Sequence, residues 1–211
     1  MILHTNWNRV NADIFWGEIA PTDHVLQIYN NDDTFLDALA GFIGSGINAG
    51  DCVLLIATAK HLELIQHRLI DYGISVQTLI EDDRYIPLDA EATLSKFMRD
   101  GWPDEKLFHE TVSALFEKAV SKGRRVRAFG EMVAILWEKG YHGATVSLEH
   151  LWNNFREKNS FTLFCAYPKA GFVGNIHDSL NTICDCHTKM IDGFERQMTE
   201  VFYSEPLKAV V

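Results

Sequence analysis

Hydrophobic residues follow two patterns along the chain: short apolar runs, and longer stretches in which apolar residues recur every three or four positions. Short continuous runs are typical of strands covered on both faces, and the spaced pattern is typical of helices with one buried face. Because the two patterns alternate, the sequence predicts a three-layer α/β fold, with a mainly parallel sheet of five or more strands between helices. The predicted strands span residues 24–30, 52–59, 75–80, 125–130 and 161–167.

The predicted helices lie between and after these strands. The first carries Phe35, Leu39 and Ile43 on one face and is expected to stop at the glycine-rich residues 44–50. Pro103 and the acids after it predict the start of another helix. The remaining predicted helices span residues 60–72, 90–99, 131–140 and 145–158, and the chain turns helical again from about residue 176.

Both ends of the chain are predicted to differ from the central α/β domain, which we place at residues 24–189. Residues 190–211 are predicted to form a C-terminal helix and tail with an apolar stripe. We expect this stripe to pack on its own domain, and packing on a second copy as a homodimer is the alternative. Residues 1–23 are predicted to dock on the domain because they are rich in aromatic side chains, namely Trp7, Phe15 and Trp16.

Composition and charge exclude several classes of protein. The 211 residues are 47% hydrophobic and 23% charged, which is typical of a globular domain. The net charge of −10 argues against nucleic acid or an anionic membrane as partner, because both require clustered Lys and Arg. The sequence begins with no signal-peptide pattern and contains no apolar span long enough to cross a bilayer, so we expect a cytoplasmic protein.

Polar side chains follow several predicted strands. Because the carboxyl ends of parallel strands meet at one edge of a sheet, we expect a ligand site there. Glu131 is central to it, since Gly130 and Glu131 join a strand directly to a helix; an acid is also favoured in a first helical turn for purely structural reasons. The segments expected at this edge are residues 29–33, 58–61, 81–83 and 165–167, together with Glu131. Within them, the predicted ligand-binding residues are Tyr29, Thr58, His61, Glu131, Cys165 and Tyr167.

Common catalytic patterns are missing from the sequence. No Gly-Lys pair occurs, and Asp32 and Asp33 after the first strand would repel a phosphate, so the sequence argues against ATP hydrolysis of the P-loop kind. No Gly-x-Ser-x-Gly elbow occurs, and Cys165 lies in an apolar run, where its thiol is expected to be inert.

Cys184, Cys186 and His187 are the candidate metal ligands in the sequence, with His177 upstream. On a helix, however, the two cysteines would point about 200° apart, so one ion could bind both only if the helix is broken there. We therefore expect two packed thiols, no metal and no cofactor.

Several blocks of residues resemble the MEDS domain, a sensory domain of methanogen and methylotroph regulators. The most specific are Phe129-Gly130-Glu131-Met132 and Cys165-Ala166-Tyr167-Pro168. Further matching blocks, in order along most of the chain, are residues 16–20, 24–29, 88–90, 136–137, 148–153 and 183–187.

The resemblance implies a RecA- or KaiC-like core that has lost the phosphate loop. It also implies a role in signal transduction, sensing a small organic molecule such as a simple hydrocarbon derivative. Because only one helix is predicted after residue 190, we expect the output to come either from a partner in trans, such as a histidine kinase or a transcription regulator, or from self-association. The polar residues that the resemblance brings forward are His24, Tyr29, Glu131, Cys165 and His187.

The function predicted from the sequence is a non-enzymatic small-molecule sensor domain. Glu131 and Tyr29 are the predicted hydrogen-bonding groups, and Trp137 or Phe172 the predicted apolar walls. One alternative is a degenerate RecA-like scaffold that binds only another protein. The other is an enzyme that depends on a nucleotide or a metal.

Overall fold

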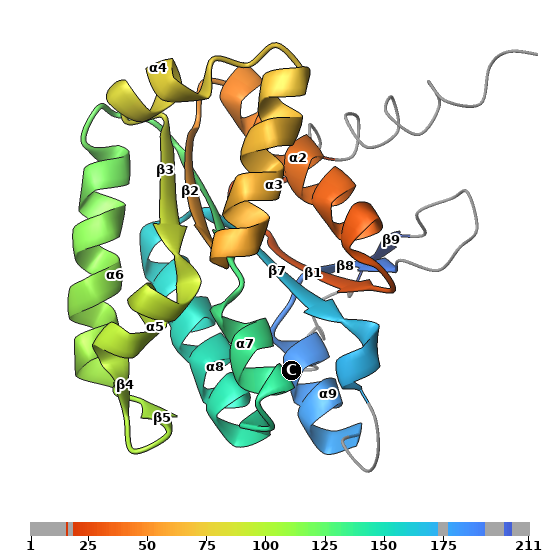
Figure 1. Ribbon diagram of the computed structural model, residues 1–211. Helices are drawn as coiled ribbons and strands as arrows, with labels where there is room; N and C mark the ends of the chain where they lie inside the picture. The colour runs from red at the N-terminus through yellow and green to blue at the C-terminus, as the bar shows by residue number, and fades with distance from the viewer. Residues whose placement is uncertain (1–15, 17–18, 173–176, 193–200, 204–211) are drawn as a thin grey trace, which may run out of the picture.

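The computed structural model of the protein describes residue 16 and residues 19–172, 177–192 and 201–203. These residues contain a seven-stranded sheet with the order β3-β2-β6-β7-β1-β8-β9 (Figure 1). The first six strands in this order are parallel, and β9 runs antiparallel to β8. The strands are β1 (His24–Tyr29), β2 (Cys52–Ala57), β3 (Tyr85–Asp89), β6 (Val126–Gly130), β7 (Thr162–Pro168), β8 (Lys189–Asp192) and β9 (Val201–Tyr203).

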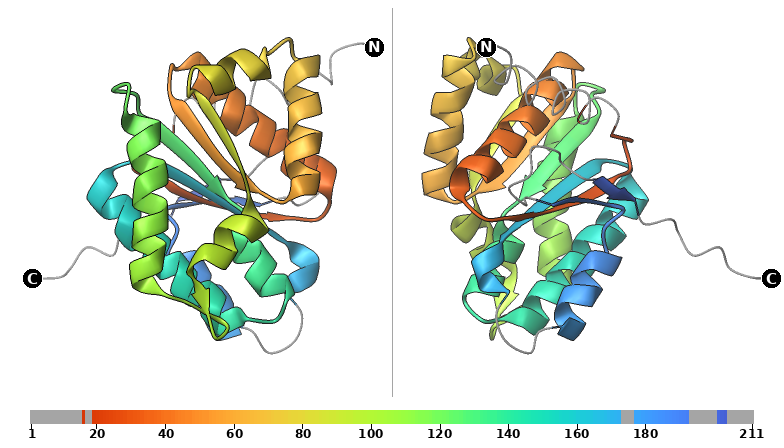
Figure 2. Two further views of the ribbon diagram at one scale, coloured as in Figure 1. Left: turned by 60° about the vertical axis from the view of Figure 1, so that its left-hand side comes forward. Right: turned by 90° about the vertical axis from the view of Figure 1, so that its right-hand side faces the viewer.

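Helices cover both faces of the sheet, which confirms the predicted three-layer α/β class (Figure 2). One layer holds α2 (Asp32–Asn48), α3 (Ala59–Asp71) and the short α4 (Val76–Glu81). The opposite layer holds α5 (Ala90–Phe97), α6 (Glu105–Val120), α7 (Met132–Glu138), α8 (His142–Asn159) and α9 (His177–Asp185). The remaining elements are the 3-10 helix η1 (Lys169–Gly171) and the strand pair β4 (Met98–Arg99) and β5 (Trp102–Pro103).

Each face of the sheet has its own hydrophobic core. In β2, Leu54 and Ile56 face the α5–α9 layer, whereas Val53 and Leu55 face α2 and α3. Side chains alternate between the two faces of a strand, so a strand covered on both sides must be apolar at every position. This double coverage explains the continuous apolar run in β2.

Four helices begin where a polar side chain accepts a hydrogen bond from a backbone N–H three residues ahead. This capping satisfies one of the donors that the first helical turn leaves without a partner. The capping residues are Asn31 for α2, Thr58 for α3, Asp89 for α5 and Asp104 for α6.

The predicted helix start at Pro103 is two residues early, because Pro103 belongs to β5 and α6 begins at Glu105.

The prediction of a strand at residues 75–80 was wrong, because this segment forms α4. Its buried residues, Val76 and Leu79, are three positions apart, which suits one face of a helix and not the alternation of a strand. The third strand is instead β3. Asp82 therefore precedes a strand instead of ending one, and it pairs with Arg124 at 2.8 Å. The prediction that residues 81–83 lie at the carboxyl edge of the sheet was wrong, because they come before β3.

Two further predictions were wrong at helix and strand ends. Helix α2 does not stop at Gly44 but continues to Asn48, and Gly46 allows close packing against Arg127. Where a helix was predicted from residue 190, the described residues 190–192 and 201–203 lie in strands β8 and β9. Met190 and Ile191 contact opposite cores, which is the two-residue period of a strand.

The predicted docking of the N-terminal segment holds for the residues that are described there. Trp16 is 1% exposed, and its ring lies 5.1 Å from the rings of Phe42 and Phe164, centroid to centroid. Trp7, Phe15, Phe194 and Met198 lie outside the described residues. Among those that are described, no helix combines the length and the hydropathy that a bilayer span requires.

Candidate functional site

The carboxyl ends of four neighbouring strands, β2, β6, β7 and β1, surround a pocket of about 330 Å³. Strands β1 and β2 lead into α2 and α3 on one face, whereas β6 and β7 lead into α7 and α9 on the other. Diverging connections of this kind open a crevice at the carboxyl edge of a parallel sheet. The pocket is lined by Tyr29, Asp32, Thr58, Lys60, His61, Glu131, Glu138 and Pro168.

Glu131 joins β6 to α7 at the floor of the crevice. Although it occupies the cap position of α7, its side chain does not cap that helix. Its carboxylate instead accepts hydrogen bonds from the backbone N–H of Thr58 at 2.7 Å and from Nδ1 of His61 at 2.6 Å. The acid therefore connects the ends of β6 and β2, which the helix-start explanation of Glu131 does not account for.

His61 is buried beside Glu131, with one ring nitrogen committed and the other not. Nδ1 donates to Glu131, and Nε2 lies 3.8 Å from Oδ2 of Asp32 and has no hydrogen-bond partner in the described chain. Burial lowers the pKa of His61, but the hydrogen bond and charge of Glu131 outweigh burial and raise the pKa above its ordinary value. Nε2 is therefore the group most in need of a partner in this pocket.

Tyr29 and Lys60 add two donors to the pocket. Burial and the neighbouring Glu131 raise the pKa of the Tyr29 phenol, so it stays protonated, and its ring stacks on Phe35 with 4.8 Å between centroids. Lys60 Nζ lies 2.5 Å from Oδ2 of Asp32. Both groups are therefore available as hydrogen-bond donors next to the acids of the lining.

The structure brings Tyr29, Thr58, His61 and Glu131 together, as the sequence predicts. Asp32 and Lys60 belong to the strand-end segments 29–33 and 58–61, which the sequence also placed at this edge. Sequence reasoning did not include Glu138 and Pro168. Pro168 ends β7, so its position after an apolar run was the available signal.

Other predicted site residues lie away from this pocket. Cys165 and Tyr167 point to the face of the sheet that α5–α9 cover, whereas their neighbours Phe164 and Ala166 point to the face that α2 and α3 cover. Trp137 and Phe172 do not line the pocket but pack on each other, with 4.9 Å between ring centroids.

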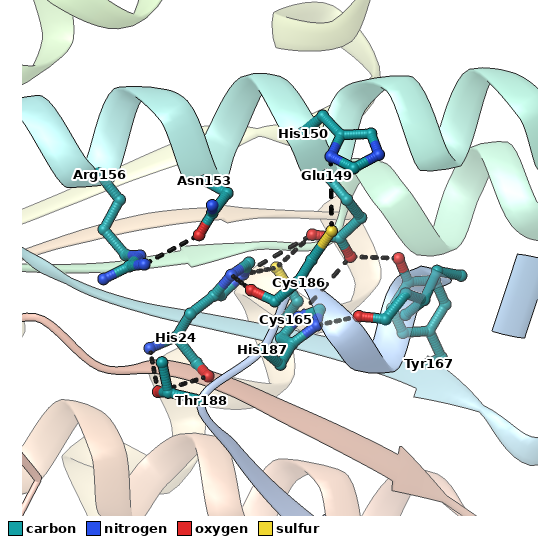
Figure 3. A network of polar contacts seen from close by, with 11 residues as sticks. His24, Glu149, His150, Asn153, Arg156, Cys165, Tyr167, Cys186, His187 and Thr188 are labelled. Atoms are coloured by element: carbon teal, nitrogen blue, oxygen red, sulfur yellow. Dashed lines mark hydrogen bonds and ion pairs between the residues drawn. The ribbon is translucent and has the colours of Figure 1, made fainter. Parts of the chain in front are cut away.

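A second group of polar residues lies buried under α8 and α9 (Figure 3). It consists of His24 at the start of β1, Glu149 on α8, Cys165 on β7 and His187 after α9. One ligand-type atom from each of the four lies within 4.8 Å of each of the others, and all four residues are buried. The phenol of Tyr167 donates a hydrogen bond to Oε1 of Glu149.

Burial favours the uncharged form of each group in this cluster. It raises the pKa of Glu149 to about 7, although hydrogen bonds from Tyr167 and Cys165 act in the opposite direction. It lowers the pKa of His187 to about 4, lowers that of His24 and raises that of Cys165. Without a bound cation, the cluster is therefore held as neutral acid, thiol and imidazoles.

The cluster unites residues that the sequence suggested separately with one that it did not suggest. His24, Cys165 and His187 were candidates, but Glu149 was missed. The available signal was that Glu149, a charged residue, directly follows Leu148 in the apolar pattern of the predicted helix. Cys184 and Cys186 are half-buried, and Sγ of Cys186 lies 3.7 Å from Nδ1 of His150.

Solved structures with the same architecture define the class of the fold as RecA/KaiC-like. The Pyrococcus horikoshii protein PH0250 matches with a TM-score of 0.57 and 11% identity, over 94% of this chain and 93% of its own. The KaiC-like protein PH0186 of P. horikoshii matches with a TM-score of 0.55 and 10% identity, over 86% and 76%. The flagellar accessory protein FlaH of Methanocaldococcus jannaschii matches with a TM-score of 0.52 and 9% identity, over 92% and 81%.

The family is identified from sequence. Residues 23–188 match the model of MEDS, the methanogen/methylotroph, DcmR sensory domain, and the chain belongs to this family. Among curated proteins, none matches the chain. The protein is therefore a sensory domain of signal transduction, built on a RecA/KaiC-like fold.

Proposed function

We propose that the domain binds a small polar organic molecule in the pocket at the carboxyl edge and passes this information to a signalling partner, without catalysing a reaction. Membership in a sensory family supports the role in general terms. The observation that carries the choice of site is the buried Nε2 of His61, which lacks a hydrogen-bond partner in the described chain and lies in the lining of the pocket. A buried polar atom of this kind is stabilised when a ligand supplies the missing hydrogen bond.

The lining restricts the chemistry of the ligand. Three acids, Asp32, Glu131 and Glu138, face two basic side chains, Lys60 and His61. This balance disfavours phosphates and other anions, in agreement with the missing Gly-Lys pair. A neutral or cationic derivative of a simple hydrocarbon, with an oxygen or nitrogen that pairs with His61 and Tyr29, fits the lining best. The volume of about 330 Å³ lies at the small end of the usual range for ligand pockets.

Signal output follows from the position of the pocket between the first turns of two helices. Thr58 caps α3 and Glu131 precedes α7, so a ligand bound to His61 or Glu131 contacts the helix starts on both faces of the sheet. A ligand shifts a conformational equilibrium only if its affinity differs between the two states. We propose that the shifted state is recognised by a histidine kinase or a transcription regulator in trans.

The test is a thermal-shift screen of the purified chain with small alcohols, ketones, amides and amines, and with acetate and phosphate as anionic counterparts. We expect at least one neutral or cationic compound to raise the melting temperature in a concentration-dependent way, and the anions to have no effect. His61→Asn should abolish the shift. The matched control is His67→Asn, which changes an exposed histidine of the same helix outside the pocket and should preserve it.

Two results would contradict the proposal. One is a folded protein whose melting temperature no compound changes, which would favour the scaffold alternative. The other is a ligand whose effect survives in His61→Asn, since the binding site would then lie elsewhere. Tight binding of ATP would favour a nucleotide-dependent enzyme instead.

A further inference from the structure

We propose that His24, Glu149, Cys165 and His187 form a binding site for a divalent transition-metal ion, with zinc as the expected ion. The four residues come from four separate elements: the start of β1, α8, β7 and the link between α9 and β8 (Figure 3). None of the four residues lines the edge pocket, so the site does not rest on the proposed small-molecule function.

Two separations of His24 Nε2, to the sulfur of Cys165 and to Oε2 of Glu149, match those of tetrahedral coordination, and the others lie within 4.8 Å. Zinc bonds of about 2.0 Å to nitrogen or oxygen and 2.3 Å to sulfur place neighbouring ligand atoms about 3.3–3.6 Å apart. Nε2 of His24 lies 3.5 Å from Sγ of Cys165 and 3.6 Å from Oε2 of Glu149. Oε2 of Glu149 lies 3.8 Å from Sγ of Cys165, and Oε1 lies 3.8 Å from Nε2 of His187.

These distances are too long for ordinary hydrogen bonds between nitrogen and oxygen. Such bonds span about 2.7–3.2 Å, whereas both histidine–glutamate separations exceed 3.5 Å. Four buried polar groups thus converge on one centre, where Sγ of Cys165 makes long hydrogen-bond contacts to His24 at 3.5 Å and to Glu149 at 3.8 Å. Ligand atoms that surround an ion have this arrangement.

Both imidazoles have Nδ1 next to a backbone carbonyl oxygen, and their rings lie close together, with 3.8 Å between centroids. Nδ1 of His24 lies 2.8 Å from the carbonyl oxygen of Cys186, and Nδ1 of His187 lies 2.6 Å from that of Ile183. A carbonyl oxygen only accepts, so each Nδ1 carries the proton and each neutral ring keeps its lone pair on Nε2. Histidine ligands of metal ions show this backbone hydrogen bond on the second nitrogen.

Tyr167 orients the carboxylate in a similar way. Its phenol donates to Oε1 of Glu149, which leaves Oε2 directed at His24 and Cys165. A hydrogen bond to the outer oxygen of a ligating carboxylate holds that group in place and is typical of metal sites. Tyr167 is therefore a positioning residue of the proposed site.

Charge balance also favours a divalent ion. On binding, the thiol of Cys165 and the carboxyl group of Glu149 release their protons to solvent, so two negative ligands neutralise the two positive charges of the ion. No net charge is then buried in an interior where an unpaired charge would be strongly unfavourable. Imidazole and thiolate ligands prefer zinc and similar ions to magnesium or calcium, and four protein ligands are typical of a closed structural site.

The site would fasten the last strands to the rest of the domain. His187 is followed by Thr188, whose backbone N–H donates to the carbonyl oxygen of His24 at 2.8 Å, and then by β8. A metal ion shared by His24 and His187 adds a second connection at the same place. Metal binding should therefore stabilise the pairing of β8 with β1.

The test uses the full chain, freed of metal with a chelator and then supplied with zinc or cobalt(II). We expect one ion per chain by elemental analysis and native mass spectrometry, a higher melting temperature with zinc, and a thiolate-to-cobalt charge-transfer band with cobalt. Cys165→Ser should remove this band and weaken binding by more than about 10-fold. Tyr167→Phe should keep the band but weaken binding about 10- to 100-fold, as expected for an outer partner of a metal ligand.

The matched control is Cys186→Ser. This cysteine lies next to His187 in sequence, but its sulfur is not one of the four ligand atoms, so the variant should keep both the band and the affinity. Circular dichroism checks the fold of each variant, and Tyr167→Phe keeps the test decisive if Cys165→Ser fails to fold. The proposal is overturned if folded wild-type chain takes up no stoichiometric ion, which leaves a neutral hydrogen-bonded cluster. Loss of the band in Cys186→Ser alone would equally overturn the assigned ligand set.

Discussion

Glu131 and His61 form a buried pair at the carboxyl ends of the neighbouring strands β6 and β2, with 2.6 Å between Oε1 and Nδ1. The two residues are 70 positions apart in sequence. Because Glu131 also accepts the backbone N–H of Thr58, a single carboxylate holds the start of α3 against the end of β6. This relationship orients the second nitrogen of His61 and makes the pocket polar.

Removal of the Glu131 carboxylate should destabilise the fold. In Glu131→Ala, the N–H of Thr58 and Nδ1 of His61 lose their acceptor, so we expect the free energy of unfolding to fall by about 1–3 kcal/mol. Urea denaturation followed by circular dichroism measures this change. Glu110→Ala, at an exposed position on α6, should change stability by less than about 0.5 kcal/mol. Equal losses in the two variants would contradict the role assigned to Glu131.

The same pair should make stability depend on pH. Burial opposes protonation of His61, but Glu131 outweighs it, so the folded-state pKa lies above the ordinary value of about 6.5. The stabilisation is then fully present below about pH 6.5 and is lost as the pH rises through the folded-state pKa. In Glu131→Gln the His61 pKa should fall, which an NMR titration of the imidazole measures directly. An unchanged pKa in the variant would show that Glu131 is not the cause.

Two glycines of α2 should respond in opposite ways to alanine. A Cβ at Gly44 would meet nothing within 4 Å, so Gly44→Ala should stabilise the protein by about 0.5–1 kcal/mol through helix propensity. A Cβ at Gly46 would lie 2.8 Å from Cδ of Arg127 and 3.1 Å from Cγ2 of Val53. Arg127 is held by Asp51 at 2.9 Å and cannot easily move, so Gly46→Ala should cost about 1–3 kcal/mol. Denaturation curves of the two variants with the same sign would refute this account.

Trp16 should contribute strongly to stability despite its place near the N-terminus. Its side chain is buried between α2 and β7, against Phe42 and Phe164, so Trp16→Ala should cost about 3–5 kcal/mol. Trp102 is 56% exposed and serves as the control of the same residue type. We expect a much smaller loss of unfolding free energy for Trp102→Ala. Similar losses in the two variants would mean that the N-terminal contact is not part of the folded core.

The sequence by itself determined the class of the fold and part of the pocket. Apolar runs such as the one in β2 can be satisfied only between two layers, so they indicate a sheet with helices on both faces. Tyr29, Thr58 and Glu131 end three such runs, and parallel strands bring their carboxyl ends to one edge. Local pattern was misleading at residues 75–80 and after residue 189, where short amphipathic segments fit either a helix or a strand.

Only the tertiary structure decided which polar residues meet. Cys165 was expected beside Glu131, but strand alternation directs it to the opposite face, where Glu149 from α8 and His187 from the α9–β8 link join it. Strand order determines that β1 lies between β7 and β8, and this order brings His24 to the same cluster. The contacts of His24 join residues more than 100 positions apart. All contacts of the cluster depend on side-chain direction and on the packing of helices across the sheet, which local sequence patterns do not encode.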